Sequence, residues 1–224
     1  MPEERRRRAD GERTREAILR EAVSLATVDG LDGISIGNLA AALDMSKSGL
    51  YAHFGSKLDL QLATVDEAER IFDAEVIAPA LEAEPGLAQV VALCDAFFAH
   101  LTRRTFPGGC FLAGAVLEMG SRPGPVKERI AAFQGRFASI MRRFVVTAIE
   151  QHELPADEEA NALAFELNGI ILAANAGWVL TENPAAIELA RHVVRHRLGL
   201  PPDSAAPRTS RARSRARPPA RRRS

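Results

Sequence analysis

The residue types best suited to binding chemistry gather between positions 46 and 57. A short predicted helix in this stretch turns its polar side chains outward and its apolar side chains inward. Amine, hydroxyl and imidazole groups on one small surface are suited to contacts with DNA phosphates and base edges. The exposed positions of the helix are Lys47, Ser48, Gly49, Tyr51 and His53. This pattern predicts a helix-turn-helix that reads DNA.

Two lysines in this stretch break a local rule of helix stability. Lys47 and Lys57 each occupy the first position of a predicted helix, where a cation opposes the helix dipole and costs a few tenths of a kcal/mol. A phosphate close to either helix start would reverse this effect, because backbone amides and lysine would attract the same anion. We therefore interpret both lysines as phosphate contacts. The alternative is that each is a solvated lysine, tolerated at small cost.

Capping residues define the helices that position these side chains. Ser35, Ser46 and Ser56 each precede a predicted helix, where a hydroxyl accepts a hydrogen bond from a backbone N–H. Asp44 is expected to form the turn between the two short helices, since aspartate tolerates left-handed backbone. Apolar side chains are expected to pack the helices together: Leu39, Ala42, Leu43, Leu50 and Phe54.

Residues 34–60 resemble the DNA-binding domain of the TetR family of transcriptional repressors. The resemblance rests on Ile-x-x-Leu-Ala in the first helix, Ser-Lys-Ser-Gly-Leu-Tyr-x-His-Phe in the second, and Ser-Lys-x-x-Leu after it. It implies that Ser46, Lys47, Ser48 and Gly49 lie in or beside the major groove and that Tyr51, His53 and Lys57 hold phosphates. Two positions depart from the family pattern: Asp44 replaces the common turn glycine, and Ala52 replaces a frequently larger polar residue.

The whole chain of 224 residues is expected to be all-α, because alanine and leucine are abundant and apolar residues recur at helical spacing. Glycine and proline divide it into predicted helices over 10–28, 56–77, 87–104, 110–120, 126–151, 155–180 and 184–198. We expect four parts: a disordered basic arm (1–9), a three-helix helix-turn-helix domain (10–55), a larger helical effector-binding and dimerisation domain (56–200), and a disordered arginine- and proline-rich tail (201–224).

A formal net charge of zero hides strong segregation of charge along the chain. Residues 201–224 contain eight arginines and one acid, a sum of +7, so the rest of the chain sums to −7. The helix-turn-helix region is itself not strongly basic, which counts mildly against DNA binding. The arginines at the two ends could supply the missing charge. The tail is a solvated end, a non-specific DNA tether, or a contact for an acidic surface.

Several classes of protein are not expected from this sequence. The charged N-terminus lacks an apolar signal region and no run is expected to span a bilayer, so a cytoplasmic protein without a membrane partner follows. Two cysteines make neither a disulfide framework nor a zinc site by themselves. His192 and His196 share a helix face but lack an evident third ligand, so no metal or cofactor is expected. No nucleophile–base constellation or phosphate loop indicates an enzyme.

Small residues mark one face of the predicted helix over 155–180. They are Gly169, Ala173, Ala176 and Gly177, at a spacing that lets a second helix approach closely. The partner helix belongs either to the same chain or to a second copy. The resemblance implies a homodimer joined through the last two long helices. A symmetric dimer with two reading heads fits double-stranded DNA with a palindromic operator.

Seven of the ten phenylalanines lie between positions 97 and 144, which indicates either a packed core or an apolar pocket for a small molecule. The resemblance implies that an effector binds in this region and repositions the DNA-reading heads. The candidate pocket residues are Phe97, Leu101, Cys110, Leu117, Phe133, Phe137, Met141, Asn175 and Trp178.

The sequence thus predicts a transcriptional repressor that a small, largely apolar effector releases from its operator. One alternative is a DNA-binding regulator that responds to no ligand. Another is a thiol-based sensor acting through Cys110, since a helix N-terminus lowers the pKa of a thiol. A buried, inert Cys110 is the simpler interpretation of the same residue.

Overall fold

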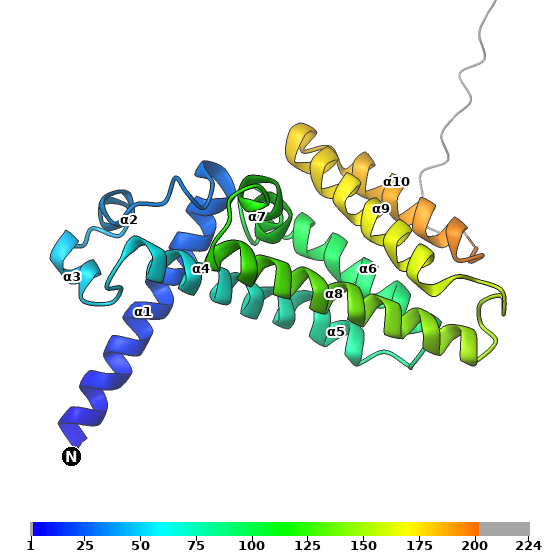
Figure 1. The fold of residues 1–224 in the computed structure, drawn as a ribbon, viewed down its shortest axis with the longest axis horizontal. Coiled ribbons are helices and arrows are strands. Elements are labelled where there is room, and N and C mark those ends of the chain that lie inside the picture. The colour runs from blue at the N-terminus through cyan, green and yellow to red at the C-terminus, as the bar shows by residue number, and fades with distance from the viewer. Residues whose placement is uncertain (1, 202–224) are drawn as a thin grey trace, which may run out of the picture.

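The computed structural model describes residues 2–201, with side chains described from Gly11 onward, and shows helices joined by turns without a strand in that range (Figure 1). This confirms the predicted all-α class. The elements are α1 (Pro2–Asp29), α2 (Ile36–Ala42), α3 (Lys47–Tyr51), α4 (Lys57–Phe72), the π-helical segment η1 (Asp73–Ile77), α5 (Ala78–Leu81), α6 (Leu87–Thr102), α7 (Phe111–Met119), α8 (Pro125–Glu150), α9 (Ala160–Thr181) and α10 (Pro184–Arg197).

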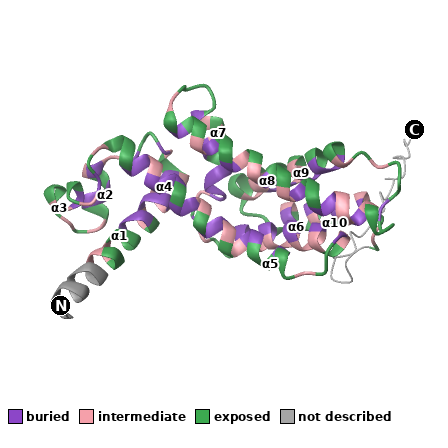
Figure 2. Cartoon of the chain, turned by 60° about the horizontal axis from the view of Figure 1, so that its bottom comes forward, coloured by how far each residue is buried: buried purple, intermediate pink, exposed green. Residues whose placement is uncertain are grey.

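Helices α2 and α3 lie at one end of an elongated molecule, with α9 and α10 toward the other (Figure 1). Helix α4 joins the two parts, because it packs against α1 on one side and α8 on the other. Figure 2 shows buried residues along α4 and exposed residues over α3. The head of the molecule, α1 to α3, is held together by the buried side chains of Leu39, Leu50 and Phe54.

The N-terminal segment differs from the prediction. Helix α1 begins at Pro2 rather than near Asp10, so the expected disordered arm over residues 1–9 is wrong for residues 2–9. Proline at a first helical position, followed by glutamates, arginines and alanine, is a good helix start, because these residues favour the helix or its dipole. Met1 and residues 202–224, which include most of the predicted arginine tail, lie outside the described residues.

Two other helix boundaries also differ from the prediction. The helical path of α4 continues through η1 and α5 to Leu81, because the change to π-helical hydrogen bonding next to Pro79 accommodates the missing N–H of the proline. Helix α9 begins at Ala160 rather than Pro155. Its N-cap is Glu159, whose carboxylate accepts hydrogen bonds from the amides of Asn161 (3.1 Å) and Ala162 (2.6 Å).

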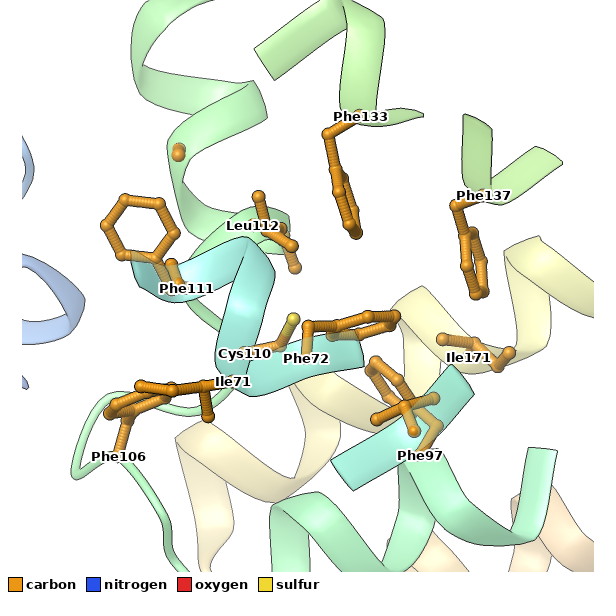
Figure 3. Close-up of a cluster of buried hydrophobic side chains, with 14 of the residues drawn as sticks. Ile71, Phe72, Phe97, Phe106, Cys110, Phe111, Leu112, Phe133, Phe137 and Ile171 are labelled. Atoms are coloured by element: carbon orange, nitrogen blue, oxygen red, sulfur yellow. The ribbon is translucent and has the colours of Figure 1, made fainter. Parts of the chain in front are cut away.

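Most of the phenylalanines between α6 and α8 pack into a core. Phe72 of α4 lies edge-on against Phe133 and Phe137, with ring centroids 5.3 and 5.5 Å apart, and Phe97 approaches it from α6 at 6.2 Å (Figure 3). Such edge-to-face contacts stabilise a core beyond the burial of area alone. This cluster joins α4 to the helices of the C-terminal part.

Helix α9 carries more exposed apolar surface than its neighbours. By length and composition α9 is apolar enough to cross a membrane, and it is the one such helix among the described residues. The expectation that no segment is long and apolar enough to span a bilayer is therefore wrong. Only 28% of its most apolar window is buried. We call the exposed surface the α9–α10 face, made of Phe165, Gly169, Leu172, Ala176 and Leu180 on α9 with Leu189 and Val193 on α10.

Candidate DNA-reading head and effector cleft

The serine caps of the head form the predicted hydrogen bonds. The hydroxyl oxygens of Ser35, Ser46 and Ser56 accept hydrogen bonds from backbone amides three residues on, at 3.0, 3.1 and 3.1 Å. Asp44 adopts the left-handed backbone expected of the turn, with φ of 51°. These local contacts fix the two short helices, and with them the direction in which α3 presents its side chains.

Helix α3 turns its polar side chains to solvent and buries Leu50 beneath them. Ser46, Lys47, Ser48 and Tyr51 are exposed, and Tyr51 keeps 55% of its surface accessible. Gly49 and His53 are half-buried on the same short segment. Of the seven predicted DNA-binding residues, the structure therefore leaves four exposed and two half-buried in a short segment at the end of the molecule.

Lys57, the seventh predicted residue, has a partner within the protein. Its Nζ donates hydrogen bonds to the main-chain oxygen of Asp32 at 2.6 Å and to the Asp32 Oδ1 at 3.0 Å. Arg122 reaches the other carboxylate oxygen of Asp32 at 2.6 Å. The hydrogen bond from Lys57, followed by that from Arg122, lowers the pKa of Asp32. The ammonium has a third N–H and half of the side chain is exposed, so a phosphate contact by Lys57 would share the ammonium between Asp32 and DNA.

A carboxylate from α7 holds the loop that follows α1. The two oxygens of Glu118 accept hydrogen bonds from the amides of Leu31 at 2.7 Å and Asp32 at 2.8 Å. Gly30 makes this approach possible: its φ is +79°, and a Cβ there would lie 3.0 Å from Glu118 Oε2. We call this contact the Glu118 clamp. Because 86 residues or more separate the partners, nothing in local sequence patterns pointed to it.

The segment before α7 makes a second contact with α1. The amide of Gly108 donates to Thr27 Oγ1 at 3.0 Å, and a Cβ at Gly108 would lie 1.8 Å from the Thr27 main-chain oxygen. Only glycine permits that approach. Helix α7 is therefore attached near both of its ends to the last turn of α1 and the loop after it, so a displacement of α7 must move or strain the head.

The opposite side of α7 borders an open cleft between α7, α8 and α9, with a volume of 360 Å³. This volume lies within the range of small-molecule sites in proteins. The lining residues of the α7–α9 cleft are Gly108, Ala113, Gly114, Val116, Leu117, Gln134, Leu172, Asn175, Ala176, Val179 and Leu180. The same helix thus forms a wall of the cleft and grips the head.

The structure distributes the predicted pocket residues over several places. Leu117 and Asn175 line the α7–α9 cleft. Phe137 and Met141 border a separate groove between α8 and α9. Phe97, Leu101 and Phe133 are buried in the core, with Phe97 and Phe133 visible in Figure 3. The guanidinium carbon of Arg104 lies 5.8 Å from the centroid of the half-buried Trp178 ring.

Both cysteines are buried, and neither is in a disulfide. Burial raises the pKa of Cys110 and outweighs the opposing hydrogen bonds from the amides of Ala113 and Leu112 at the start of α7. Burial likewise raises the pKa of Cys94 to about 12. A thiol with a raised pKa is a poor nucleophile near neutral pH, so the environment of Cys110 is that of an inert core residue.

The small residues of α9 lie on two different surfaces: one packs against α10 and the other is exposed. A Cβ at Gly177 would lie 3.1 Å from the Cβ of Ala186, so Gly177 allows α9 to pack closely on α10 within the chain. A Cβ at Gly169 would meet nothing within 4 Å. Ala173 and Ala176 are also exposed. Three of the four predicted dimerisation residues are therefore accessible to another molecule, and Gly177 faces its own chain.

A polar pair of one buried and one half-buried residue lies beside the aromatic core and was not foreseen from the sequence. His100 is 3% exposed, and its Nδ1 is 2.7 Å from Oε2 of Glu75 in η1. Thr105 donates to the same oxygen at 2.7 Å. Burial would raise the pKa of Glu75, but the hydrogen bonds from His100 and Thr105 and the charge of Arg103 lower it overall. The π-helical turn positions this carboxylate, so the pair ties α6 to the end of α4.

Comparisons with known proteins agree with this geometry. Residues 18–64 match the family model described as bacterial regulatory proteins of the tetR family, and residues 86–194 match the tetracyclin repressor-like C-terminal domain. A comparison with curated proteins found no match.

Solved structures share the fold over most of the chain. A TetR transcriptional regulator from Chloroflexus aurantiacus is 26% identical, with a TM-score of 0.75 over 85% of this chain and 96% of that one. SCO4454, a TetR-family regulator from Streptomyces coelicolor, is 24% identical, with a TM-score of 0.71 over 84% and 94% of the two chains. AibR, solved with isovaleryl coenzyme A and operator DNA, is 22% identical, with a TM-score of 0.64 over 81% and 97%. With both parts of the chain matched, the protein belongs to the TetR family of DNA-binding transcriptional regulators.

Proposed function

We propose that the protein is a homodimeric repressor that occupies a palindromic operator and leaves it when a small, largely apolar effector binds the C-terminal part. The observation that carries the proposal is the position of α7, which borders a cleft on one side and holds the DNA-reading head on the other. An effector that binds one position of α7 better than another would shift the orientation of the head.

The DNA-contacting role of α3 is supported by its exposed polar side chains on a rigid base. Leu50 is fully buried below them, and the caps at Ser46 and Ser56 fix both flanking turns. A helix of this kind reads a major groove, and two copies related by a twofold axis read half-sites about 34 Å apart. Ser46, Lys47, Ser48 and Gly49 would then lie in or beside the major groove, with Tyr51 and His53 on phosphates.

Dimerisation is supported by the α9–α10 face. Phe165 is 79% exposed and Leu180 is 84% exposed, and large exposed apolar side chains gathered along one side of a helix mark an interaction site in a folded protein. A second copy of the same face would bury both helices in a four-helix arrangement. The two heads would then be held at a fixed separation, which is what recognition of a palindromic operator requires.

Effector release is supported by the connection between cleft and head. The structure of AibR contains both isovaleryl coenzyme A and operator DNA, so a protein of this fold binds a small molecule as well as DNA. The buried, high-pKa Cys110 gives no comparable support to a thiol-based sensor.

The test is DNA binding by a double variant, Lys47→Ala with Tyr51→Ala, at duplexes selected from a random-sequence library with the native protein. We expect the affinity for selected duplexes to fall roughly tenfold or more at fixed salt, because a charge and an aromatic hydroxyl leave the reading surface. Lys127→Ala is the matched control, since it removes one exposed lysine from α8. Equal losses in both variants, or selection of no consensus half-site, would refute the assignment of α3 as the reader.

A further inference from the structure

The α7–α9 cleft has no charge on its walls. None of its eleven lining residues is acidic or basic, and nine of them offer only backbone or apolar side-chain surface. Moving a charged ligand group out of water into such a site without a counter-charge costs several kcal/mol. The lining therefore disfavours carboxylates, phosphates and ammonium groups, and favours an uncharged molecule with an apolar body.

Two side-chain amides supply the polar contacts of the cleft. Asn175 Oδ1 accepts the hydrogen bond from the amide of Cys110 at 2.9 Å. Because a backbone N–H can only donate, this contact fixes the orientation of the Asn175 amide and leaves its NH₂ group as a donor. The half-buried Gln134 side-chain amide has no hydrogen-bond partner among residues 11–201 and keeps both its donor and its acceptor.

From these two observations we infer that the α7–α9 cleft binds an uncharged ligand with an apolar body and a neutral carboxamide or similar carbonyl group. Asn175 would donate to the carbonyl oxygen, and Gln134 would accept from the amide N–H of the ligand. Leu117 and Leu172 would cover the apolar body. Because Leu172, Ala176 and Leu180 also belong to the α9–α10 face, the second copy of the proposed dimer would border the cleft. The inference deepens the proposed repressor function, because it names the class of effector.

The cleft has room for substitutions that fill it without disturbing the core. Gly114 lies on the wall formed by α7, and a Cβ placed there would meet nothing within 4 Å. Gly135 of α8 is also exposed, and a Cβ there would meet nothing within 4 Å, but it is not a lining residue. Gly114→Phe and Gly135→Phe therefore form a matched pair, in which the same side chain enters the cleft or points elsewhere.

The chain also carries its own reporter of binding. Trp178 is the sole tryptophan of the sequence and lies on α9 between the lining residues Asn175 and Val179. Its fluorescence should respond when a ligand displaces water from the cleft. Calorimetric titration gives the same affinity without relying on the indole.

The experiment titrates the full chain with octanamide, octanoate and octylamine, which share one apolar chain and differ in charge. We expect octanamide to bind with saturation and at least tenfold more tightly than either charged compound. Gly114→Phe should abolish octanamide binding and Gly135→Phe should retain it. Gln134→Leu should weaken binding roughly fivefold to tenfold, the effect of one lost hydrogen bond.

Three outcomes would overturn the inference: equal affinity for the amide and the carboxylate, octanamide binding that survives Gly114→Phe, or no octanamide binding at all. A change of oligomeric state in Gly114→Phe without ligand binding would assign the cleft to the contact between two copies. Operator binding is measured separately without ligand. If the protein recognises DNA but does not bind octanamide in the cleft, this inference alone is refuted. If the protein does not recognise DNA, the repressor proposal is refuted and the octanamide titrations can still be interpreted.

Discussion

The pKa of Cys110 is subject to two opposing influences, the helix N-terminus and burial, and burial is the larger. Its position directly before α7 exposes it to the amides of the first helical turn, which favour a thiolate. The side chain is nevertheless only 5% exposed, and desolvation of the charged form is the larger effect, so the pKa is raised. A sequence motif can locate the helix start, but it cannot show that the sulfur points inward.

This environment predicts that neither cysteine reacts in the native protein. With the pKa of Cys94 near 12 and that of Cys110 raised, we expect iodoacetamide at pH 8 to label both sites at least a hundredfold more slowly than in the protein unfolded by guanidinium. Mass spectrometry of timed samples measures the rates. Labelling of native Cys110 at the unfolded rate would revive the thiol-sensor hypothesis.

At the scale of a helix, α9 has two apolar faces with different surroundings. One face carries Leu163, Leu167 and Ile171 into the core, and the other presents the α9–α10 face to solvent. A helix that is apolar all round is expected to be covered on all sides. The uncovered side is therefore the natural place for a second copy.

The dimer proposal predicts that a charge on this face separates the two copies. We expect Phe165→Glu to raise the dimer dissociation constant by at least a hundredfold, because two carboxylates would be buried in one symmetric interface. Sedimentation equilibrium measures the constant. Leu81→Glu introduces the same charge at a half-exposed leucine on α5 and should leave the constant unchanged. A Phe165→Glu protein that still dimerises like the native chain would contradict the proposed face.

Helix positions were predictable where a capping residue marks the start, as at Ser46, or where apolar residues recur at helical spacing, as along α8. The exceptions have physical causes. Pro79 does not end its helix because a π turn absorbs the missing donor, and Pro155 does not begin one because Glu159 supplies the cap. The polar surface of α3 was predictable because its spacing is local. The Glu118 clamp and the α7–α9 cleft were not, since they join residues far apart in sequence.

At the scale of the whole molecule, α7 connects the C-terminal part to the head through specific hydrogen bonds as well as through packing against α1. Its end holds the loop after α1 through the Glu118 clamp, and the segment before it meets Thr27 through Gly108. Helix α4 provides the broader, apolar connection. A ligand that shifts α7 would therefore act on these hydrogen bonds as well as on the buried side chains of α7, such as Phe111 and Leu112.

Weakening the clamp should loosen the loop without unfolding the protein. In Glu118→Gln the amide presents one acceptor instead of two, so one of the amides of Leu31 and Asp32 loses its partner. We expect the less protected of the two to exchange hydrogen about tenfold faster, equivalent to about 1.4 kcal/mol, as measured by hydrogen-exchange NMR. Glu128→Gln on the exposed start of α8 is the matched control. Unchanged exchange at both amides would show that the carboxylate does not hold the loop.

The ion pair between Lys57 and Asp32 has a consequence for how the protein would respond to ionic strength. Most of the salt dependence of DNA binding comes from small cations that leave the DNA when a protein cation takes their place. The charge of Lys57 is already partly neutralised by Asp32, which also holds Arg122. A Lys57 that contacts a phosphate would share its ammonium between that phosphate and the carboxylate. Lys57 would therefore contribute less to the salt dependence of DNA binding than a lysine without a carboxylate partner.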